Sequence, residues 1–176
     1  MSLIILEGLD GTGKSALAEK LSEHLGWPIV NLFDKYDKEF LESIEINVET
    51  YHEDLYFMDV WKQVGFNCIK DRGLISGWVY ENDNFVNAKE AMGFWFNEMK
   101  ENKEEIYFIF LDARNDTIVE RDSEWEGKEE ELNQHRDYFR IIRKALKQNG
   151  FNVIQLSTDK KNEKETFKEV VECLNL

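Results

Sequence analysis

The chain has little cysteine, one proline and no long apolar run. Its two cysteines, Cys68 and Cys173, lack the spacing of a metal site, and we expect neither to form a disulfide. The apolar run near the N-terminus, residues 3–6, is too short for a signal peptide or a membrane span. We therefore expect a cytoplasmic protein with no membrane partner.

Basic residues are also scarce. Lys and Arg total 22 against 36 Asp and Glu, so the formal net charge is −14. Such a balance repels polyanions and disfavours nucleic acid as a partner. The sequence is 42% hydrophobic and 13% aromatic over 176 residues, which predicts one packed domain spanning residues 1–176.

One segment carries a specific chemical signal. Residues 8–15 read G-x-x-x-x-G-K-S, the pattern of a phosphate-binding P-loop, and they follow a strand-like run and precede a helical pattern. Glycines let backbone N–H groups converge on a phosphate, and the helix N-terminus adds partial positive charge. We expect Lys14 to bridge the β- and γ-phosphates and Ser15 to hold Mg²⁺. The alternative is a glycine-rich turn without a ligand. The residues expected to bind ATP here are Gly8, Gly11, Thr12, Gly13, Lys14, Ser15 and Leu17.

Apolar periodicity predicts alternating strands and helices. Besides residues 3–6, the predicted strands are 27–33, 66–71, 106–112 and 153–156; the predicted helices follow Lys14 and span 36–46, 50–64, 88–102, a stretch ending at 121, 129–148 and a closing segment at 167–174. Alternation of this kind indicates an α/β fold, with a parallel sheet covered by helices on both faces. No repeat or linker interrupts it.

Ligands of such sheets bind at the carboxyl ends of the strands. Acidic residues stand at three of these ends, at Asp34, Asp71 and Asp112. Asp71 could hold Mg²⁺, and the neighbouring Arg72 could clamp a transferring phosphoryl group. The alternative for this pair is an exposed ion pair.

Three motifs resemble those of the thymidylate kinase family. They are the P-loop segment 6–15, the segment 71–80 with its Asp-Arg start, and Leu111-Asp112 with a later arginine at 121. The resemblance implies a three-layer P-loop kinase with a five-stranded parallel sheet, Mg·ATP as the donor and a lid at about 122–128. It implies roles for five further residues: Asp10 near the acceptor 3′-hydroxyl, Arg72 on the acceptor phosphate, Ser76 and Tyr80 at the acceptor, and Arg121 at the ATP phosphates or adenine.

The sequence departs from that family in its cations. No arginine precedes Arg72, which leaves Lys35, Lys38 and Lys62 as replacements for acceptor-binding arginines. The P-loop also lacks an arginine, and the lid is acidic, so Arg114 or Arg136 could substitute at the nucleotide. Gly73 stands where the family has an aromatic residue.

The leading interpretation is an ATP-dependent kinase for a pyrimidine deoxynucleoside monophosphate. The missing arginines keep open a kinase for a plain hydroxyl, on a deoxynucleoside or a hydroxymethyl pyrimidine, even in DNA. Asp34 would then serve as general base; it is otherwise a solvated acid. A third alternative is a nucleotide-gated binding module. The residues expected to catalyse transfer are Lys14, Asp71, Arg72, Asp10 and Asp34.

Aromatic residues of the predicted helix 50–64 have two interpretations. Phe57 and Trp61 could stack on a nucleobase, although most such rings belong to the core. The apolar excess of this helix would also permit a homodimer.

Overall fold

A single parallel sheet forms the centre of the molecule. The computed structural model describes residues 1–31, 56–80, 93 and 95–175. Its sheet has five strands in the order β2-β3-β1-β4-β5, and every neighbouring pair is parallel. The strands are β1 (Leu3–Gly8), β2 (Ile29–Val30), β3 (Cys68–Asp71), β4 (Ile106–Asp112) and β5 (Asn152–Ser157). The predicted α/β fold is confirmed.

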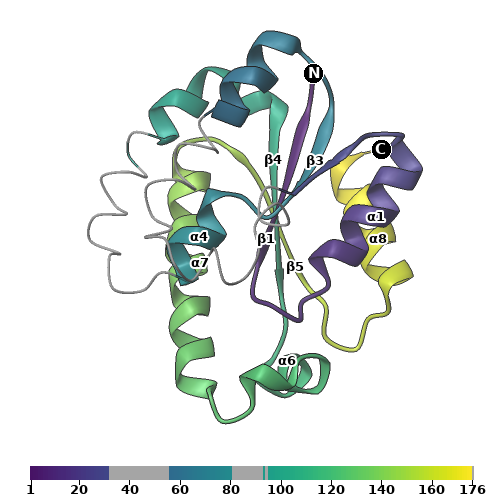
Figure 1. Cartoon of the computed structure of the whole chain (residues 1–176), viewed down its shortest axis with the longest axis vertical. Helices are drawn as coiled ribbons and strands as arrows, with labels where there is room; N and C mark the ends of the chain where they lie inside the picture. The colour runs from purple at the N-terminus through teal and green to yellow at the C-terminus, as the bar shows by residue number, and fades with distance from the viewer. Residues whose placement is uncertain (32–55, 81–92, 94, 176) are drawn as a thin grey trace.

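Helices cover both faces of this sheet. Helices α1 and α8 lie together on one face, and α4 and α7 lie on the other (Figure 1). Their bounds are α1 (Lys14–Leu25), α4 (Leu74–Tyr80), α6 (Asn115–Arg121), α7 (Glu129–Gln148) and α8 (Glu163–Leu174), with short 3-10 helices η3 (Lys100–Glu105) and η4 (Ser123–Trp125). Residues 56–64 and 95–99 are helical too.

The core consists of two apolar clusters, one on each face. Alternate residues of β1 point to opposite sides, so Leu3 and Ile5 pack towards α4 and α7 whereas Ile4 and Leu6 pack towards α1 and α8. All six residues of β1 are buried. A strand covered on both faces must be apolar throughout, which is why residues 3–6 show no alternation. Because β1 is packed on both faces, its carboxyl end, where the P-loop begins, has a fixed position in the sheet.

Several expected elements differ in extent. The second strand is short, and the third begins at Cys68, which is buried. Residues 74–80 form α4, which the sequence analysis did not predict, and the predicted helix 88–102 continues beyond residue 99 as a 3-10 helix. Residues 36–46, and the first part of the predicted helix 50–64, lie outside the described residues.

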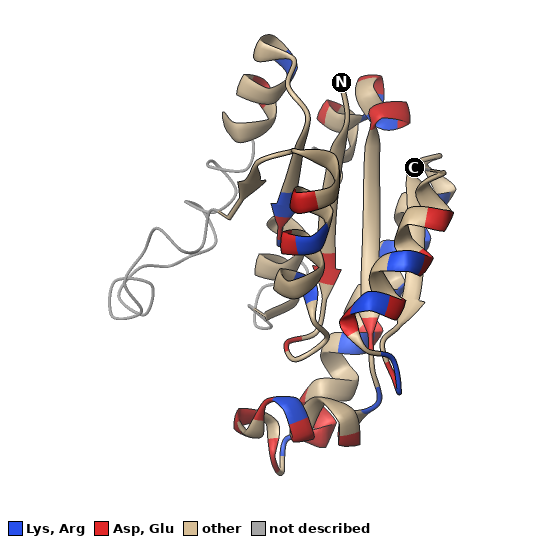
Figure 2. Cartoon of the chain, turned by 90° about the vertical axis from the view of Figure 1, so that its right-hand side faces the viewer, with Lys and Arg blue, Asp and Glu red and all other residues tan. Residues whose placement is uncertain are grey.

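The surface of the described part mixes charges of both signs. Figure 2 shows Lys and Glu interspersed along α8, which ends at the C-terminus, instead of a patch of one sign. Within the described ranges no helix is both long enough and apolar enough to cross a bilayer. A cytoplasmic location and the absence of a nucleic-acid partner stay predictions.

Candidate active site

The P-loop takes a conformation that its glycines make accessible. Gly11 and Gly13 have φ angles of 71° and 87°, and Gly8 has a φ of 134°. These values lie in the region that residues with a Cβ rarely adopt. A Cβ at Gly8 would also lie 2.0 Å from the Leu111 carbonyl oxygen on β4. Gly13 is the N-cap of α1, so the loop ends at the positive end of that helix.

Lys14 lies under the loop with its ammonium group held by the backbone. Its Nζ donates hydrogen bonds to the carbonyl oxygens of Gly8 (2.9 Å) and Leu9 (2.7 Å), and the residue is 4% exposed. Thr12 Oγ1 donates to the same Leu9 carbonyl at 2.6 Å. Burial lowers the pKa of Lys14 to about 8. A bound phosphate would favour the charged form of Lys14, which burial disfavours.

An ionic chain joins Lys14 to the segment after β3. Asp10 Oδ1 lies 3.8 Å from Lys14 Nζ, and the Arg72 guanidinium contacts the same Asp10 carboxylate. The Asp10 N–H donates to the Tyr80 hydroxyl oxygen at 2.9 Å. Four residues from two motifs that are far apart in the sequence thus meet at one place. Arg72 holds this position with a φ of 69°, a left-handed conformation that is uncommon for a residue with a side chain.

Asp71 fits the role expected of a magnesium-binding carboxylate. The residue is 4% exposed, and its Oδ1 has no hydrogen-bond partner among the described residues. Mg²⁺ prefers oxygen ligands and is usually held by one or two carboxylates together with water and phosphate oxygens. Within the described ranges no group of three or more acidic, His or Cys side chains could form a larger cage. The Asp71 carboxylate and the Ser15 hydroxyl are therefore donors of the right chemistry for Mg²⁺.

Glu7, the residue before Gly8, belongs to the site although sequence reasoning gave it no role. It is fully buried, and its oxygens accept hydrogen bonds from Ser76 Oγ (2.5 Å) and the Gly73 N–H (3.0 Å). Burial raises the pKa of Glu7 to about 7, against the opposite effects of these bonds and of Lys14 and Lys70. Ser76, expected at the acceptor, is 2% exposed and faces Glu7. The sequence did offer one signal for Glu7, since it is the one acidic residue in a strand that is otherwise apolar.

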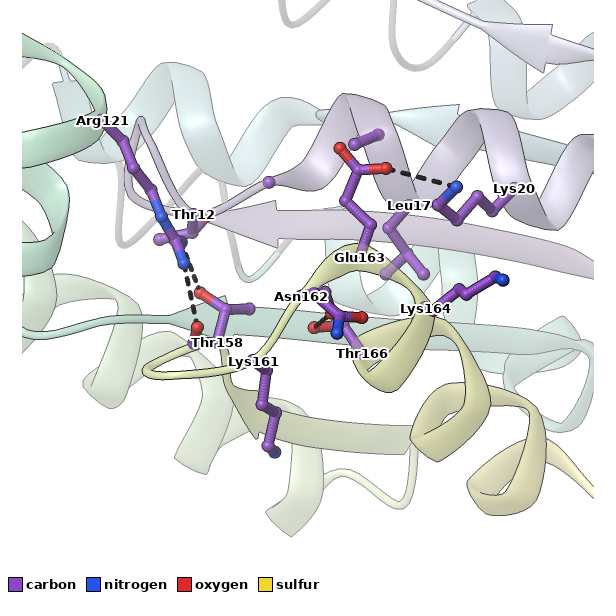
Figure 3. A pocket seen from close by; sticks show the side chains of 12 residues that line it. Thr12, Leu17, Lys20, Arg121, Thr158, Lys161, Asn162, Glu163, Lys164 and Thr166 are labelled. Atoms are coloured by element: carbon purple, nitrogen blue, oxygen red, sulfur yellow. Dashed lines mark hydrogen bonds and ion pairs between the residues drawn. The ribbon is translucent and has the colours of Figure 1, made fainter.

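A cavity of about 630 Å³ opens on the other side of the P-loop. It is lined by Thr12 and Gly13, by Leu17 of α1, by Arg121 and by the loop from β5 to α8 (Figure 3). The Arg121 guanidinium donates to the carbonyl oxygen of Gly11 (3.2 Å) and to Thr158 Oγ1 and O (both 3.0 Å). Leu17 and Arg121 thus line a cavity that adjoins the P-loop, and their contact with a nucleotide stays a prediction.

Arg114 and Arg136 lie elsewhere. Arg114 lines a separate hollow and pairs with Asp116 (3.2 Å) and Asp159 (3.8 Å). Arg136 lines the same hollow, pairs with Asp112 at 3.0 Å and also lines a third hollow beside Gly8 and Leu9. The structure therefore does not bring Arg114 into the cavity with Leu17 and Arg121. Its place as N-cap of α6, one helix length before Arg121, separates the two side chains.

The two candidate stacking rings are packed in the core. Trp61 is fully buried and donates its indole N–H to the Phe66 carbonyl oxygen at 2.8 Å. Phe57 is 9% exposed and lies under Lys70 Nζ, 4.9 Å from the ring centre. Both rings are largely buried, which favours core packing, and their stacking on a base stays a prediction. Asp34, Lys35 and Lys38 lie outside the described residues.

The predicted lid is structured by one aromatic residue. Residues 122–128 include the 3-10 helix η4, and its Trp125 is 9% exposed. The Trp125 ring packs edge-on against His135 at 5.7 Å between centroids, and His135 packs against Tyr80 at 4.9 Å. Segment 122–128 thus reaches Tyr80 through the His135 ring, and its role as a lid stays a prediction. Residues 56–64 expose Tyr56 and Val64, and a homodimer stays a prediction.

The five-stranded parallel sheet and the P-loop give the chain the fold of P-loop kinases. No family model matches the chain. Among curated proteins it is 27% identical over 156 residues to a protein named "Putative thymidylate kinase" from Acidianus bottle-shaped virus (isolate Italy/Pozzuoli), covering 86% of this chain and 92% of that protein. The likeness to thymidylate kinases expected from the motifs is thereby confirmed, and the predicted class, a phosphotransferase, is that of the relatives.

Solved structures support the fold. YorR protein from Bacillus subtilis, in complex with phosphorylated GDP, aligns with a TM-score of 0.65 at 22% identity over 99% of this chain and 96% of its own. Deoxyadenosine kinase from M. mycoides aligns with a TM-score of 0.58 at 18% identity over 98% of both chains. Shikimate kinase from Aquifex aeolicus aligns with a TM-score of 0.57 at 18% identity, over 98% of this chain and 96% of its own.

Proposed function

We propose that the chain transfers the γ-phosphoryl group of Mg·ATP to a pyrimidine deoxynucleoside monophosphate, as a thymidylate kinase does. The name of the viral relative and the three motifs support this acceptor class. The P-loop and the cavity beside Arg121 support the donor. Two structural neighbours hold nucleotides, phosphorylated GDP in YorR protein and dCMP with dCDP in deoxyadenosine kinase, which fits a nucleotide ligand here.

Each residue of the site has a physical role in this proposal. Phosphoryl transfer depends on positioning and on neutralising charge more than on covalent chemistry. The P-loop amides and Lys14 would neutralise the donor phosphates, and Arg72 would orient the acceptor phosphate through two parallel hydrogen bonds. Ser15 and Asp71 would hold Mg²⁺, which supplies further positive charge at the phosphate oxygens. Asp10 would keep Arg72 and Lys14 at a fixed separation.

The observation that carries the proposal is the chain of contacts from Arg72 through Asp10 to Lys14. A nucleotide-binding switch needs the lysine alone, whereas a kinase needs a second cation on the acceptor side of the loop. Here one carboxylate contacts both cations, and its Oδ1 is 3.8 Å from the lysine. This arrangement favours transfer between two bound molecules over simple nucleotide binding.

The test is a coupled assay of ADP release with Mg·ATP and a panel of acceptors. The panel comprises dTMP, dUMP, thymidine and 5-hydroxymethyl pyrimidine nucleosides. We expect turnover with the monophosphates and little without an acceptor. ATP hydrolysis that no acceptor accelerates would contradict the kinase proposal and favour a binding module.

A kinase that phosphorylates a plain hydroxyl is the second candidate. It is supported by the small number of arginines available to bind an acceptor phosphate. The sequence has six arginines, at positions 72, 114, 121, 136, 140 and 143. Arg114 is paired away from the P-loop, and Arg121 faces the donor cavity. Arg136, Arg140 and Arg143 line a further hollow that Gly8 and Leu9 also line. Among the described contacts, Arg72 is the arginine that pairs with Asp10. Turnover restricted to unphosphorylated acceptors in the same assay would establish this second candidate.

A further inference from the structure

The carboxylate of Glu7 lies between the P-loop and the segment that carries Asp71 and Arg72. Glu7 is the residue before Gly8, so its backbone position is fixed by β1. Its two oxygens accept from different donors: Oε1 from the Gly73 N–H at 3.0 Å and Oε2 from the Ser76 hydroxyl at 2.5 Å. Both donors belong to the turn and first residues of α4. A single side chain therefore connects two segments that are far apart in the sequence.

The turn that Glu7 holds is conformationally demanding. Arg72 has a left-handed backbone, φ 69°, and its N–H donates to the Leu6 carbonyl oxygen at 3.1 Å. A left-handed residue with a side chain costs about 1 kcal/mol or more and persists only when its surroundings enforce it. The Arg72 backbone bond fixes one side of this turn, and the Glu7 bonds fix the other.

Gly73 shows how closely the two segments approach. A Cβ at this position would lie 3.0 Å from Glu7 Oε1 and 3.2 Å from Ile5 Cγ2. Both separations are tighter than ordinary van der Waals contacts, so a side chain at this position would require the Glu7 carboxylate or the Ile5 side chain to shift by a few tenths of an ångström. The turn therefore lies directly against the Glu7 carboxylate.

Glu7 has no access to a reacting group. It is fully buried, and both of its oxygens already accept hydrogen bonds from the protein. A general base must reach the hydroxyl that it deprotonates, directly or through one water. We propose that Glu7 is a positioning residue, whose carboxylate fixes the Asp71–Gly73 turn against the P-loop so that Arg72 and Asp71 stand at the correct separation from Lys14. This inference rests on the proposed kinase function.

The experiment compares Glu7→Gln, Glu7→Ala and Ser76→Ala by steady-state kinetics. A glutamine can still accept from the Gly73 N–H and can donate to Ser76, so we expect kcat within about fivefold of the wild type. Glu7→Ala removes both bonds, and misplacement by about 1 Å can cost about 100-fold. We therefore expect its kcat to fall about 100-fold while KM for ATP changes less than about threefold. Ser76→Ala should lie between these two.

Exposed Glu19 on α1 provides matched controls, Glu19→Gln and Glu19→Ala, which we expect to match the wild type. A second readout does not depend on catalysis: amide hydrogen exchange at Gly73 should accelerate strongly in Glu7→Ala and stay slow in Glu7→Gln. If Glu7→Ala does not fold, exchange and kcat of Glu7→Gln and Ser76→Ala decide the question.

Three outcomes would overturn the inference: a Glu7→Gln variant as inactive as Glu7→Ala, unchanged kcat in Glu7→Ala, or unchanged Gly73 exchange in Glu7→Ala. If Glu7→Ala does not fold, Ser76→Ala takes its place in the test. Wild-type kcat together with wild-type Gly73 exchange in Ser76→Ala would then overturn the inference. Failure of the proposed function looks different. The wild type would then transfer no phosphoryl group to any acceptor, yet the exchange at Gly73 would still respond to the substitutions. The two ideas can therefore fail separately.

Discussion

The two sides of the P-loop are built differently. On the donor side, Arg121 donates three hydrogen bonds to the chain, and Asn162 caps α8 through a capping box with Glu165. On the transfer side, Arg72 has a left-handed backbone and Asp71 Oδ1 is buried without a partner among the described residues. Arg121 and Asn162 on the donor side have hydrogen-bond partners within the protein, whereas the transfer side has a strained backbone and a buried carboxylate oxygen without a partner among the described residues.

This difference indicates where chemistry takes place. Strained backbone and buried polar groups without partners cost stability, and they concentrate where a substrate or ion completes the site. A nucleotide-binding surface needs shape and a few fixed donors, which internal hydrogen bonds can supply in advance. The predictions below test this contrast, beginning with the residue that both sides share.

Lys14→Ala should have the largest effect, because we propose that this lysine binds the donor phosphates and it also lies 3.8 Å from Asp10. We expect transfer to fall by about 1,000-fold or more, since a buried cation aimed at developing charge dominates such reactions. The melting temperature should change little, because the substitution also removes the cost of burying a charge. The control is Lys20→Ala, at the rim of the donor cavity and paired with Glu163 at 3.2 Å. Equal activity of the two variants would refute the central place of Lys14.

The pH dependence of stability should report the buried acid of the transfer side. The pKa of Glu7 is raised to about 7, from 4.5, so the folded state retains this proton longer than the unfolded state. Stability from this group is complete below pH 4.5 and is lost as the pH rises towards 7, by about 3 kcal/mol in total. Glu7→Gln should lose this component. Urea unfolding of both proteins from pH 4.5 to 7.5 measures the difference, and parallel curves would contradict the prediction.

Substitutions at Arg72 should separate strain from function. Arg72→Ala and Arg72→Gly should both lower kcat about 100-fold, because each loses the guanidinium. Arg72→Gly should unfold with a free energy about 1 kcal/mol higher than Arg72→Ala, since glycine adopts a φ of 69° without penalty. Chemical denaturation of the pair provides the comparison. Equal stabilities would show that this turn carries no strain.

Arg121 and Arg114 should differ in their effect on the nucleotide. We expect Arg121→Ala to raise KM for ATP about tenfold, because a charge-assisted contact at the donor cavity contributes on the order of 1–2 kcal/mol. Arg114→Ala should leave KM unchanged, since Arg114 faces a different hollow. If only Arg114→Ala raised KM for ATP, the nucleotide would bind in the hollow beside Arg114, and our placement beside Arg121 would be wrong.

The regular elements of the fold could be predicted because their patterns are local. The stripe of apolar residues in 129–148 matches α7 at both ends, and the run 106–112 matches β4. Helix α4 escaped prediction because Leu74, Ile75, Ser76, Trp78 and Val79 are all buried, which leaves no polar face to reveal a helical period. Tertiary packing, not local pattern, forms this helix.

The site could be predicted only where a motif fixes the backbone. The P-loop spacing indicated Lys14, and Arg72 of the Asp-Arg pair contacts Asp10, which lies 3.8 Å from Lys14. Sequence spacing did not distinguish Arg114 from Arg121, because their directions depend on how α6 leaves β4. Burial of Trp61 likewise depends on contacts with distant strands. The predicted role of Asp34 concerns residues that the structure does not describe.

The close approach at Gly8 has a consequence beyond conformational freedom. Its α-carbon lies against the main chain of the neighbouring strand, where even a methyl group would collide with a carbonyl oxygen. The same residue therefore sets the spacing of β1 and β4 and begins the loop that we propose binds the triphosphate. Any side chain at Gly8 would both change the loop and force β1 away from β4, so we expect stability and nucleotide affinity to fall together at this position.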